Sequence, residues 1–171
     1  MNKKLMTALS GVLGLFAVTT ASVLPSGAQE EPPPPIAIEL LTEKRATFPD
    51  DVDLGIRVKL PGTSREVTKV KEPSRTVVAR ITIQPGVQVP WHTHAGPGIL
   101  NVAEGELVNV SDGDCVARSY PAGTALVDLG RGHAHTAFNP TSDVTVVIAT
   151  FFEVPETGPL TITEGVEPGD C

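Results

Sequence analysis

From residue 74 onward the chain is a series of short segments in which apolar and polar residues alternate, most of them ending at Gly or Pro. Alternation with a period of two is typical of β-strands that bury one face. Before residue 74, only residues 56–60 alternate clearly, and the charged residues 65–72 predict a solvated edge or loop. No segment after the N-terminal residues keeps a helical period of 3.6. The pattern therefore predicts an all-β fold, an antiparallel sandwich or barrel.

All four histidines fall into two His-x-His pairs, and each pair lies in a segment that is expected to be a strand. The pairs are His92 with His94 and His133 with His135. On a strand, residues two apart point to the same face, so each pair can aim both rings at one place. Imidazole is the commonest metal-ligating side chain, and converging rings suit Zn, Cu, Fe or Ni. Two such strands facing each other predict a single metal site.

The histidine pairs belong to two longer motifs with regularly placed glycines. The first reads Gly86-x5-His92-x-His94-x3-Gly98-x6-Gly105, and the second reads Gly123-x6-Gly130-x-Gly132-x2-His135-x3-Asn139. In order, spacing and flanking strands they resemble the two conserved motifs of the cupin superfamily. The resemblance covers residues 74–155 and implies a cupin barrel, which is an antiparallel double-stranded β-helix or jelly roll. It is weak evidence for function, because this fold hosts many chemistries.

The resemblance also implies roles for individual residues. His92, His94 and His135 correspond to metal ligands, so we expect one divalent transition metal ion, with Zn, Mn, Ni, Cu and Fe all open. His133 is a candidate fourth ligand or base, because we expect it to share a face with His135. Asn139 is expected on that face too, where it could orient a ring or a substrate.

The chain departs from the family pattern at two positions. Gly98 stands where the family has a glutamate ligand, and Gly130 stands where the second motif has a proline. Three neutral imidazoles without a carboxylate leave more positive charge on a metal and make it a stronger Lewis acid. We also expect Gly98 to leave space and open coordination positions. Asp128, Asp114 and Glu106 could approach the site, but nothing in the spacing places them there.

The N-terminal residues have the features of an export signal: Lys3 and Lys4 precede an apolar run, and small residues end at Ala28. Cleavage there, or after Ala21, would leave a secreted or periplasmic domain with no stable membrane span. An uncleaved anchor is the alternative, because the run is about as long as a bilayer is thick. The expected boundaries are a signal peptide over 1–28, a Pro-rich linker over 29–40, an N-terminal arm with an edge strand over 41–73, the barrel over 74–155 and a tail over 156–171.

Cysteine usage and charge add two expectations. In an exported protein the isolated pair Cys115 and Cys171 most simply forms one disulfide, with a thiolate metal ligand as the alternative. The net charge of −7 at pH 7 repels phosphate backbones, so we expect no nucleic-acid partner. Because cupin barrels often pair through sheet edges, the resemblance also makes a homodimer an expectation.

Three hypotheses for function stay open. In the first, the chain is an enzyme whose metal activates water, dioxygen or a bidentate oxygen substrate, with oxidation by dioxygen the commonest chemistry in the family. In the second, it is a non-catalytic module that binds a metal or a small ligand outside the cytoplasm, which the missing glutamate favours. In the third, the histidines are structural and the barrel is empty. Nothing in the sequence fixes a substrate.

Overall fold

The computed structural model describes residues 31–42, 44–70, 75–169 and 171. The expected export signal lies outside these residues. Pro33–Cys171 form one compact unit. Its strands are β1 (Ile36–Leu40), β2 (Leu54–Val58), β3 (Glu66–Val70), β4 (Val77–Ile83), β5 (Gln88–His92), β6 (Gly98–Glu104), β7 (Glu106–Ser111), β8 (Arg118–Pro121), β9 (Ala125–Asp128), β10 (His135–Phe138) and β11 (Thr145–Phe151). The described part of the chain has no helix that could cross a membrane.

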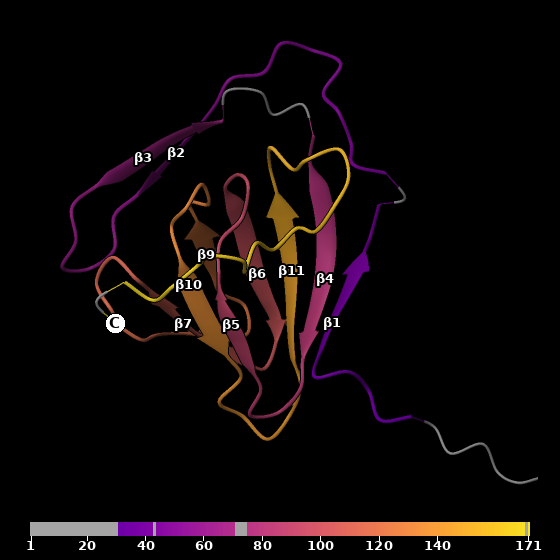
Figure 1. Cartoon of the computed structure of the whole chain (residues 1–171), viewed down its shortest axis with the longest axis vertical. Coiled ribbons are helices and arrows are strands. Elements are labelled where there is room, and N and C mark those ends of the chain that lie inside the picture. Colours follow the sequence, from indigo (N-terminus) through magenta and orange to yellow (C-terminus); the bar gives the residue numbers. More distant parts are fainter. Residues whose placement is uncertain (1–30, 43, 71–74, 170) are drawn as a thin grey trace, which may run out of the picture. The chain divides into compact units, whose positions relative to one another are not determined.

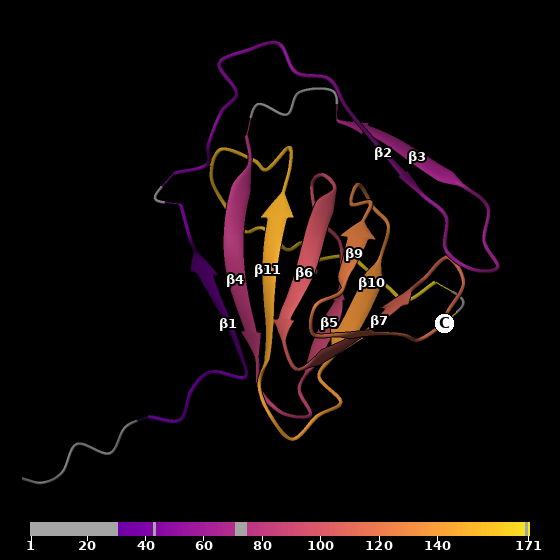
Figure 2. The same cartoon turned by 180° about the vertical axis from the view of Figure 1, so that it is seen from behind.

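Two antiparallel sheets form the barrel. One sheet has five strands in the order β1-β4-β11-β6-β9, and the other has four in the order β5-β10-β7-β8. In Figures 1 and 2, seen from opposite sides, β1, β4, β11 and β6 run side by side. Strands that are remote in the sequence are therefore neighbours in the sheets. This confirms the predicted fold class, an antiparallel double-stranded β-helix or jelly roll.

The core lies between the two sheets and is built from alternating strand residues. In β11, Val147, Ala149 and Phe151 are buried, whereas Ile148 and Thr150 between them are only partly buried. Each large apolar side chain that is removed from water in this way stabilises the fold by about 1.5–3 kcal/mol. Other strands and the segment after β11 contribute Val77, Ile83, Leu100, Val102, Leu107, Leu126, Ala137 and Val154 to the same cluster.

Strand β1 lies inside the segment that was expected to be a linker. Its residues pair with β4 from Ile36↔Ile83 to Leu40↔Ala79, at the edge of the five-stranded sheet. The prolines before it cannot donate ladder hydrogen bonds, but β-branched Ile36 and Ile38 favour a strand once the prolines end. The linker is therefore shorter than residues 29–40, because its last five residues belong to the barrel.

Strands β2 and β3 form a separate two-stranded hairpin sheet. β3 falls in the charged stretch that was expected to be a solvated edge or loop, and it pairs with β2 from Leu54↔Val70 to Val58↔Glu66. Its last residue, Val70, is buried. The guanidinium of Arg131 donates to the hydroxyl of Thr68 at 3.1 Å and to the carbonyl of Lys69 at 2.8 Å. These bonds join the hairpin to a loop of the barrel.

Candidate metal centre

Strands β5 and β10 bring the two histidine motifs together. They are antiparallel neighbours, and their register places His135 opposite His92. The ring centroids of these two residues are 4.2 Å apart. His94 lies beyond the end of β5, after Thr93, whose backbone forms an isolated bridge with Ile162 of the tail. This bridge keeps the chain extended, so His94 reaches the same side as His92.

The three rings converge on one place. The ring centroid of His94 is 5.0 Å from that of His92 and 5.4 Å from that of His135. One ring nitrogen of each residue can be chosen so that the three atoms lie within 4.8 Å of one another. All three residues are buried. Within the described ranges, no other group of three His, Cys, Asp or Glu residues is arranged in this way.

Backbone carbonyls fix the rings of the first pair. Nδ1 of His92 lies 2.7 Å from the carbonyl oxygen of Pro90, and Nδ1 of His94 lies 2.8 Å from that of Leu160. A carbonyl oxygen only accepts, so in the neutral ring the proton is on Nδ1. Each Nε2 then has a free lone pair, as in metal-ligating histidines whose other ring nitrogen donates to a carbonyl. His135 has a longer contact, 3.4 Å from Nδ1 to the carbonyl oxygen of His133.

Burial keeps two of the rings neutral. Desolvation, followed by repulsion from His135, lowers the pKa of His92 to about 4. Desolvation and then repulsion from His94 lower the pKa of His135 to about 4 as well. Because a metal ion binds the neutral imidazole, neither ring has to lose a proton before binding at neutral pH.

A buried carboxylate adjoins the rings. Asp128 is 8% exposed, and its Oδ1 accepts a hydrogen bond from the backbone N–H of Gly130 at 3.0 Å. The same Oδ1 lies 3.6 Å from Nδ1 of His135, and Oδ2 lies 3.7 Å from Nε2 of His94. Burial raises the pKa of Asp128, and attraction to His94 offsets part of that rise.

Asp114 and Glu106, the other two carboxylates that the sequence left unplaced, have partners elsewhere. Asp114 forms an ion pair with Arg118, and Nη1 of Arg118 also donates to its Oδ1 at 3.0 Å. Glu106 accepts a hydrogen bond from the hydroxyl of Ser119 at 2.6 Å. Of these three carboxylates, the described structure brings only Asp128 to the histidines.

The space expected at Gly98 is filled. A Cβ built on Gly98 would lie 2.9 Å from Cδ1 of Phe151 and 3.3 Å from Cδ1 of Leu100. The ring of Phe151 packs in turn against His94, with centroids 4.5 Å apart. A longer side chain at position 98 would have to displace this ring. The space that was expected at Gly98 is therefore occupied by the ring of Phe151.

Close packing explains the glycine at position 130. Its φ is +59°, and a Cβ there would lie 2.1 Å from the carbonyl oxygen of Gly96. The neighbouring N–H of Arg131 donates to the carbonyl of His94 at 2.7 Å. A proline would have neither the positive φ nor the room. The loops that follow the first histidine pair and precede the second are thus packed backbone against backbone.

His133 lies outside the cluster of three rings. It precedes β10, and its N–H donates to the carbonyl of Gly130 at 3.1 Å, which closes a turn. Its side chain is 55% exposed, and its Nδ1 lies 3.8 Å from Oε2 of Glu66 on the hairpin. The backbone before β10 is turned, and the described structure leaves His133 outside the cluster, although it lines the same pocket as His135.

Asn139 organises a turn at the end of β10 that is remote from His135. It is fully buried, and its Nδ2 donates to the carbonyls of Ile83 and Asp143 at 3.1 and 2.7 Å. Its Oδ1 accepts from the N–H and the hydroxyl of Thr141. These bonds occupy both ends of the amide, so the structure gives Asn139 a different place from the one expected beside the rings.

The predicted disulfide between Cys115 and Cys171 is present. It ties the tail to the loop after β7, and neither sulfur is left to bind a metal as a thiolate. On its way to this bond the tail passes the cluster, where Ile162 pairs with Thr93 and the carbonyl of Leu160 accepts from His94. The tail is thus part of the site's framework.

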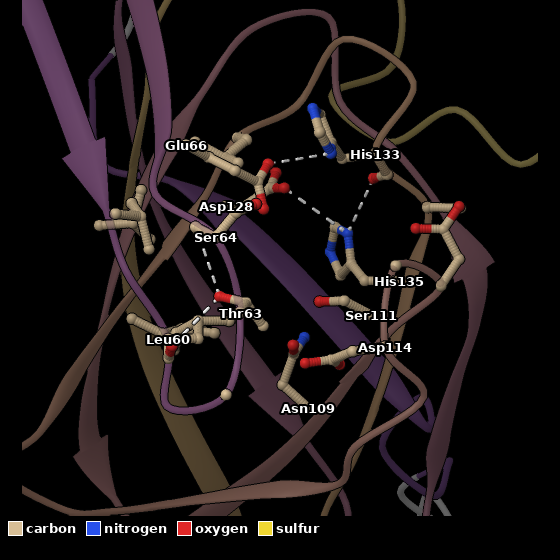
Figure 3. A pocket seen from close by; sticks show the side chains of 18 of the residues that line it. Leu60, Thr63, Ser64, Glu66, Asn109, Ser111, Asp114, Asp128, His133 and His135 are labelled. Carbon is tan, nitrogen blue, oxygen red and sulfur yellow. Dashed lines mark hydrogen bonds and ion pairs between the residues drawn. The ribbon is translucent and has the colours of Figure 1, made fainter.

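Two cavities border the cluster. A cavity of about 60 Å³ inside the barrel is lined by the three histidines and mostly apolar side chains. A pocket of about 310 Å³ is lined by Asp128, His133 and His135, and on its other side by the turn of the β2–β3 hairpin, including Thr63 and Ser64. Figure 3 shows these groups facing one another. The carboxylates that line this pocket are Glu66, Asp112, Asp114 and Asp128, and no described lining residue is Lys or Arg.

No protein-family model matches this sequence, and no curated protein is significantly similar to it. Solved structures do resemble it. One is a cupin superfamily protein from Desulfitobacterium hafniense (10% identity, covering 63% of this chain and 83% of that one, TM-score 0.41). Another is a Klebsiella pneumoniae protein with a double-stranded β-helix domain (19% identity, covering 48% of this chain and 70% of that one, TM-score 0.43). A third is a polyketide cyclase from Streptomyces resistomycificus (17% identity, covering 54% of this chain and 62% of that one, TM-score 0.44). None of these similarities bears on the chemistry of the site.

Proposed function

We propose that this chain is an exported metal-binding protein that holds one divalent transition metal ion on His92, His94 and His135. The observation that carries the proposal is the convergence of the three rings, with one nitrogen of each within 4.8 Å of the others. The carbonyls that fix two of the rings support it, because they leave both Nε2 lone pairs free. Imidazole ligands suit Zn, Ni, Cu and Fe, and Mn is included from the family resemblance.

The disulfide supports export. Disulfides persist in oxidising compartments, whereas glutathione and thioredoxin keep cytosolic thiols reduced. The bond between Cys115 and Cys171 is therefore expected of a protein that works in a periplasm or outside the cell. This agrees with the export signal expected over residues 1–28.

The pocket of about 310 Å³ supports a small-molecule ligand next to the metal, since it reaches His135 and Asp128. Four carboxylates and no Lys or Arg are found among its described lining residues. Asp114 is paired with Arg118, and the remaining carboxylates repel carboxylate and phosphate groups and favour neutral or cationic polar molecules, such as polyols and amines. A bound metal would supply a Lewis acid that polarises an oxygen of such a molecule, or activates water or dioxygen.

A non-catalytic binding module is the second candidate. It is favoured by position 98, where the family's carboxylate is absent and Phe151 fills the space. The two candidates differ in turnover: an enzyme consumes dioxygen or converts a polyol or amine at saturable rates, whereas a binder only retains the metal and its ligand. Oxygen uptake and product formation by metal-loaded protein, both measured over a panel of neutral and cationic small molecules, separate them.

The test of the metal site is elemental analysis of protein purified from its export compartment, without chelators or a histidine tag. We expect about one equivalent of a transition metal per chain in the wild type. His92→Ala and His135→Ala should lose it, and the matched control His133→Ala should keep it. If the wild type carries no metal and cannot be loaded with Zn²⁺, Mn²⁺, Ni²⁺, Cu²⁺ or Fe²⁺, the histidines are structural and the proposal is wrong.

A further inference from the structure

The carboxylate of Asp128 has one oxygen that the protein itself does not satisfy. The side chain is 6% exposed, and Oδ2 has no hydrogen-bond donor in the described structure. Buried carboxylates in proteins are normally paired, fully hydrogen-bonded or bound to a cation. The unsatisfied atom lies 3.7 Å from Nε2 of His94. That nitrogen is the one that the bond from Nδ1 to Leu160 leaves free for a metal.

The two oxygens of Asp128 have different surroundings. Oδ1 accepts from the N–H of Gly130 at 3.0 Å and lies 3.6 Å from Nδ1 of His135, so its contacts hold the side chain in place. Oδ2 lies on the metal-facing side of His94. Donor atoms that each lie about 2.0–2.2 Å from one ion are roughly 3–3.5 Å apart, so 3.7 Å is close to the spacing of two ligands of one metal. Asp128 is not among the residues whose ligand atoms all lie within 4.8 Å of one another, so metal binding would draw its Oδ2 closer to His92 or His135.

The strand register places this carboxylate beside the position where the motif lacks one. Strands β6 and β9 are antiparallel neighbours, and Gly98 is paired directly with Asp128. Directly paired residues of an antiparallel sheet have their side-chain positions about 4.5–5.5 Å apart. Gly98 on β6 has no side chain that could reach the cluster. The carboxylate of Asp128, paired with it on β9, can reach the cluster in its place.

We propose that Asp128 supplies a fourth, anionic ligand to the metal through Oδ2. This inference rests on the proposed metal site of His92, His94 and His135. It makes the centre a three-histidine, one-carboxylate site in place of a histidine-only site. The anion halves the net charge of a buried divalent ion from +2 to +1, which matters in an interior of low dielectric constant.

The test compares the affinity of wild type and Asp128→Asn for Zn²⁺, by competition with a chelator, together with the visible spectrum of the Co²⁺-loaded proteins. We expect Asp128→Asn to bind Zn²⁺ at least about 100-fold more weakly, beyond the roughly 10–100-fold effect of losing a group that only orients a ligand. The Co²⁺ d–d bands should change in position and intensity, because the coordination set changes. The matched control Glu66→Gln removes one charge from the same pocket, and should change affinity by no more than about threefold because that exposed charge is screened.

Folding and ligation can be separated. Asparagine keeps an acceptor for the N–H of Gly130 and removes a buried charge, so metal-free Asp128→Asn should unfold no earlier than the metal-free wild type. Independently of any variant, the infrared difference spectrum of the wild type on adding Zn²⁺ should show a shifted carboxylate stretch.

The inference is overturned if that band does not shift, or if Asp128→Asn loses less than about tenfold in affinity with an unchanged Co²⁺ spectrum. Either result would leave the three-histidine site intact. If the wild type itself binds neither Zn²⁺ nor Co²⁺, the proposed function fails, which is a different outcome.

Discussion

His92 and His94 both reach the cluster, whereas of His133 and His135 only the second does, although both pairs have the same spacing. The backbone makes the difference. Around the first pair the chain is extended, in β5 and then in the bridge between Thr93 and Ile162. Before the second pair, three consecutive residues have positive φ: 59° at Gly130, 54° at Arg131 and 91° at Gly132.

This comparison shows that His-x-His spacing aims two rings together only where both residues belong to extended chain. The turn over residues 130–133 removes His133 from the inside of the barrel and places it beside Glu66 of the hairpin. The same turn packs Gly130 against Gly96 and gives Asp128 the N–H that holds its Oδ1. The turn thus places His133 outside the cluster and fixes Asp128 beside it.

The largest expected effect comes from replacing His94 by alanine, and the control is the same replacement at His133 in the other pair. His94→Ala should weaken Zn²⁺ binding by about 100-fold or more, because each of a few ligands carries a large share of the binding free energy. His133→Ala, the matched member of the other pair, should change it by less than about threefold. Chelator competition measures both constants. Equal losses in the two variants would contradict the difference between the pairs.

The turn that separates the pairs can be tested by stability. Gly130→Ala adds a Cβ 2.1 Å from a backbone oxygen at positive φ, and should lower the free energy of unfolding by about 3 kcal/mol. Gly132→Ala also has positive φ, +91°, but its Cβ meets nothing within 4 Å. It should therefore cost only about 1 kcal/mol. Urea unfolding gives both values, and a cost at Gly130 no larger than that at Gly132 would argue against the loop packing.

The buried rings of His92 and His135 should lower the stability of the metal-free protein as the pH falls. The pKa of His92 and of His135 is lowered to about 4 in the fold from an ordinary value of 6.5. Between these values the unfolded chain takes up protons that the folded chain does not, so stability falls as pH falls from 6.5 to 4. The loss is on the order of 3 kcal/mol for one ring.

Asp128 opposes this loss, because its pKa is raised and the folded form gains a proton as the pH falls. The net loss of stability between pH 6.5 and 4 should therefore be larger in Asp128→Asn than in the wild type. Urea unfolding of the metal-free proteins across this range measures the net slope. Stability that is flat in both proteins would show that the rings are not desolvated.

The smallest expected effect concerns the tail, whose Leu160 carbonyl orients the ring of His94. Replacing Cys115 and Cys171 by Ser frees the end of the tail, whose Leu160 carbonyl holds Nδ1 of His94. We expect Zn²⁺ affinity to fall by about tenfold, the lower end for loss of a group that orients a ligand. The affinities are compared at a temperature where both proteins are folded. Unchanged affinity would mean that the tail stays in place without the disulfide.

Much of the fold could be predicted because the period of two and the Gly and Pro stops are local signals. β4 is an example, since its alternation and its Pro-Gly stop are adjacent in the sequence. β3 was missed because its charged residues Glu66 and Lys69 lie on opposite faces and the apolar Val67 is exposed, so its strand character depends on pairing with β2. β1 was hidden by the prolines before it.

The site was predictable only as far as strand geometry is local. The same-face arrangement of His92 and His94 follows from their spacing, but His133 shows that a neighbouring turn can cancel that rule. Asp128 could not be placed because its position depends on the register between β6 and β9, which pairs it with Gly98. Likewise, only the packing of Phe151 reveals that the space at Gly98 is filled.

The passage of the tail over the cluster has a consequence for biosynthesis. The carbonyl that orients His94 comes 66 residues later in the chain. Until the residues around Leu160 have been synthesised, the ring of His94 has no fixed direction, because the backbone that will hold it is still missing. The site is therefore complete only after the tail has folded over it and the disulfide has formed. Under the export proposed above, this order would favour the metals of the compartment in which the disulfide forms.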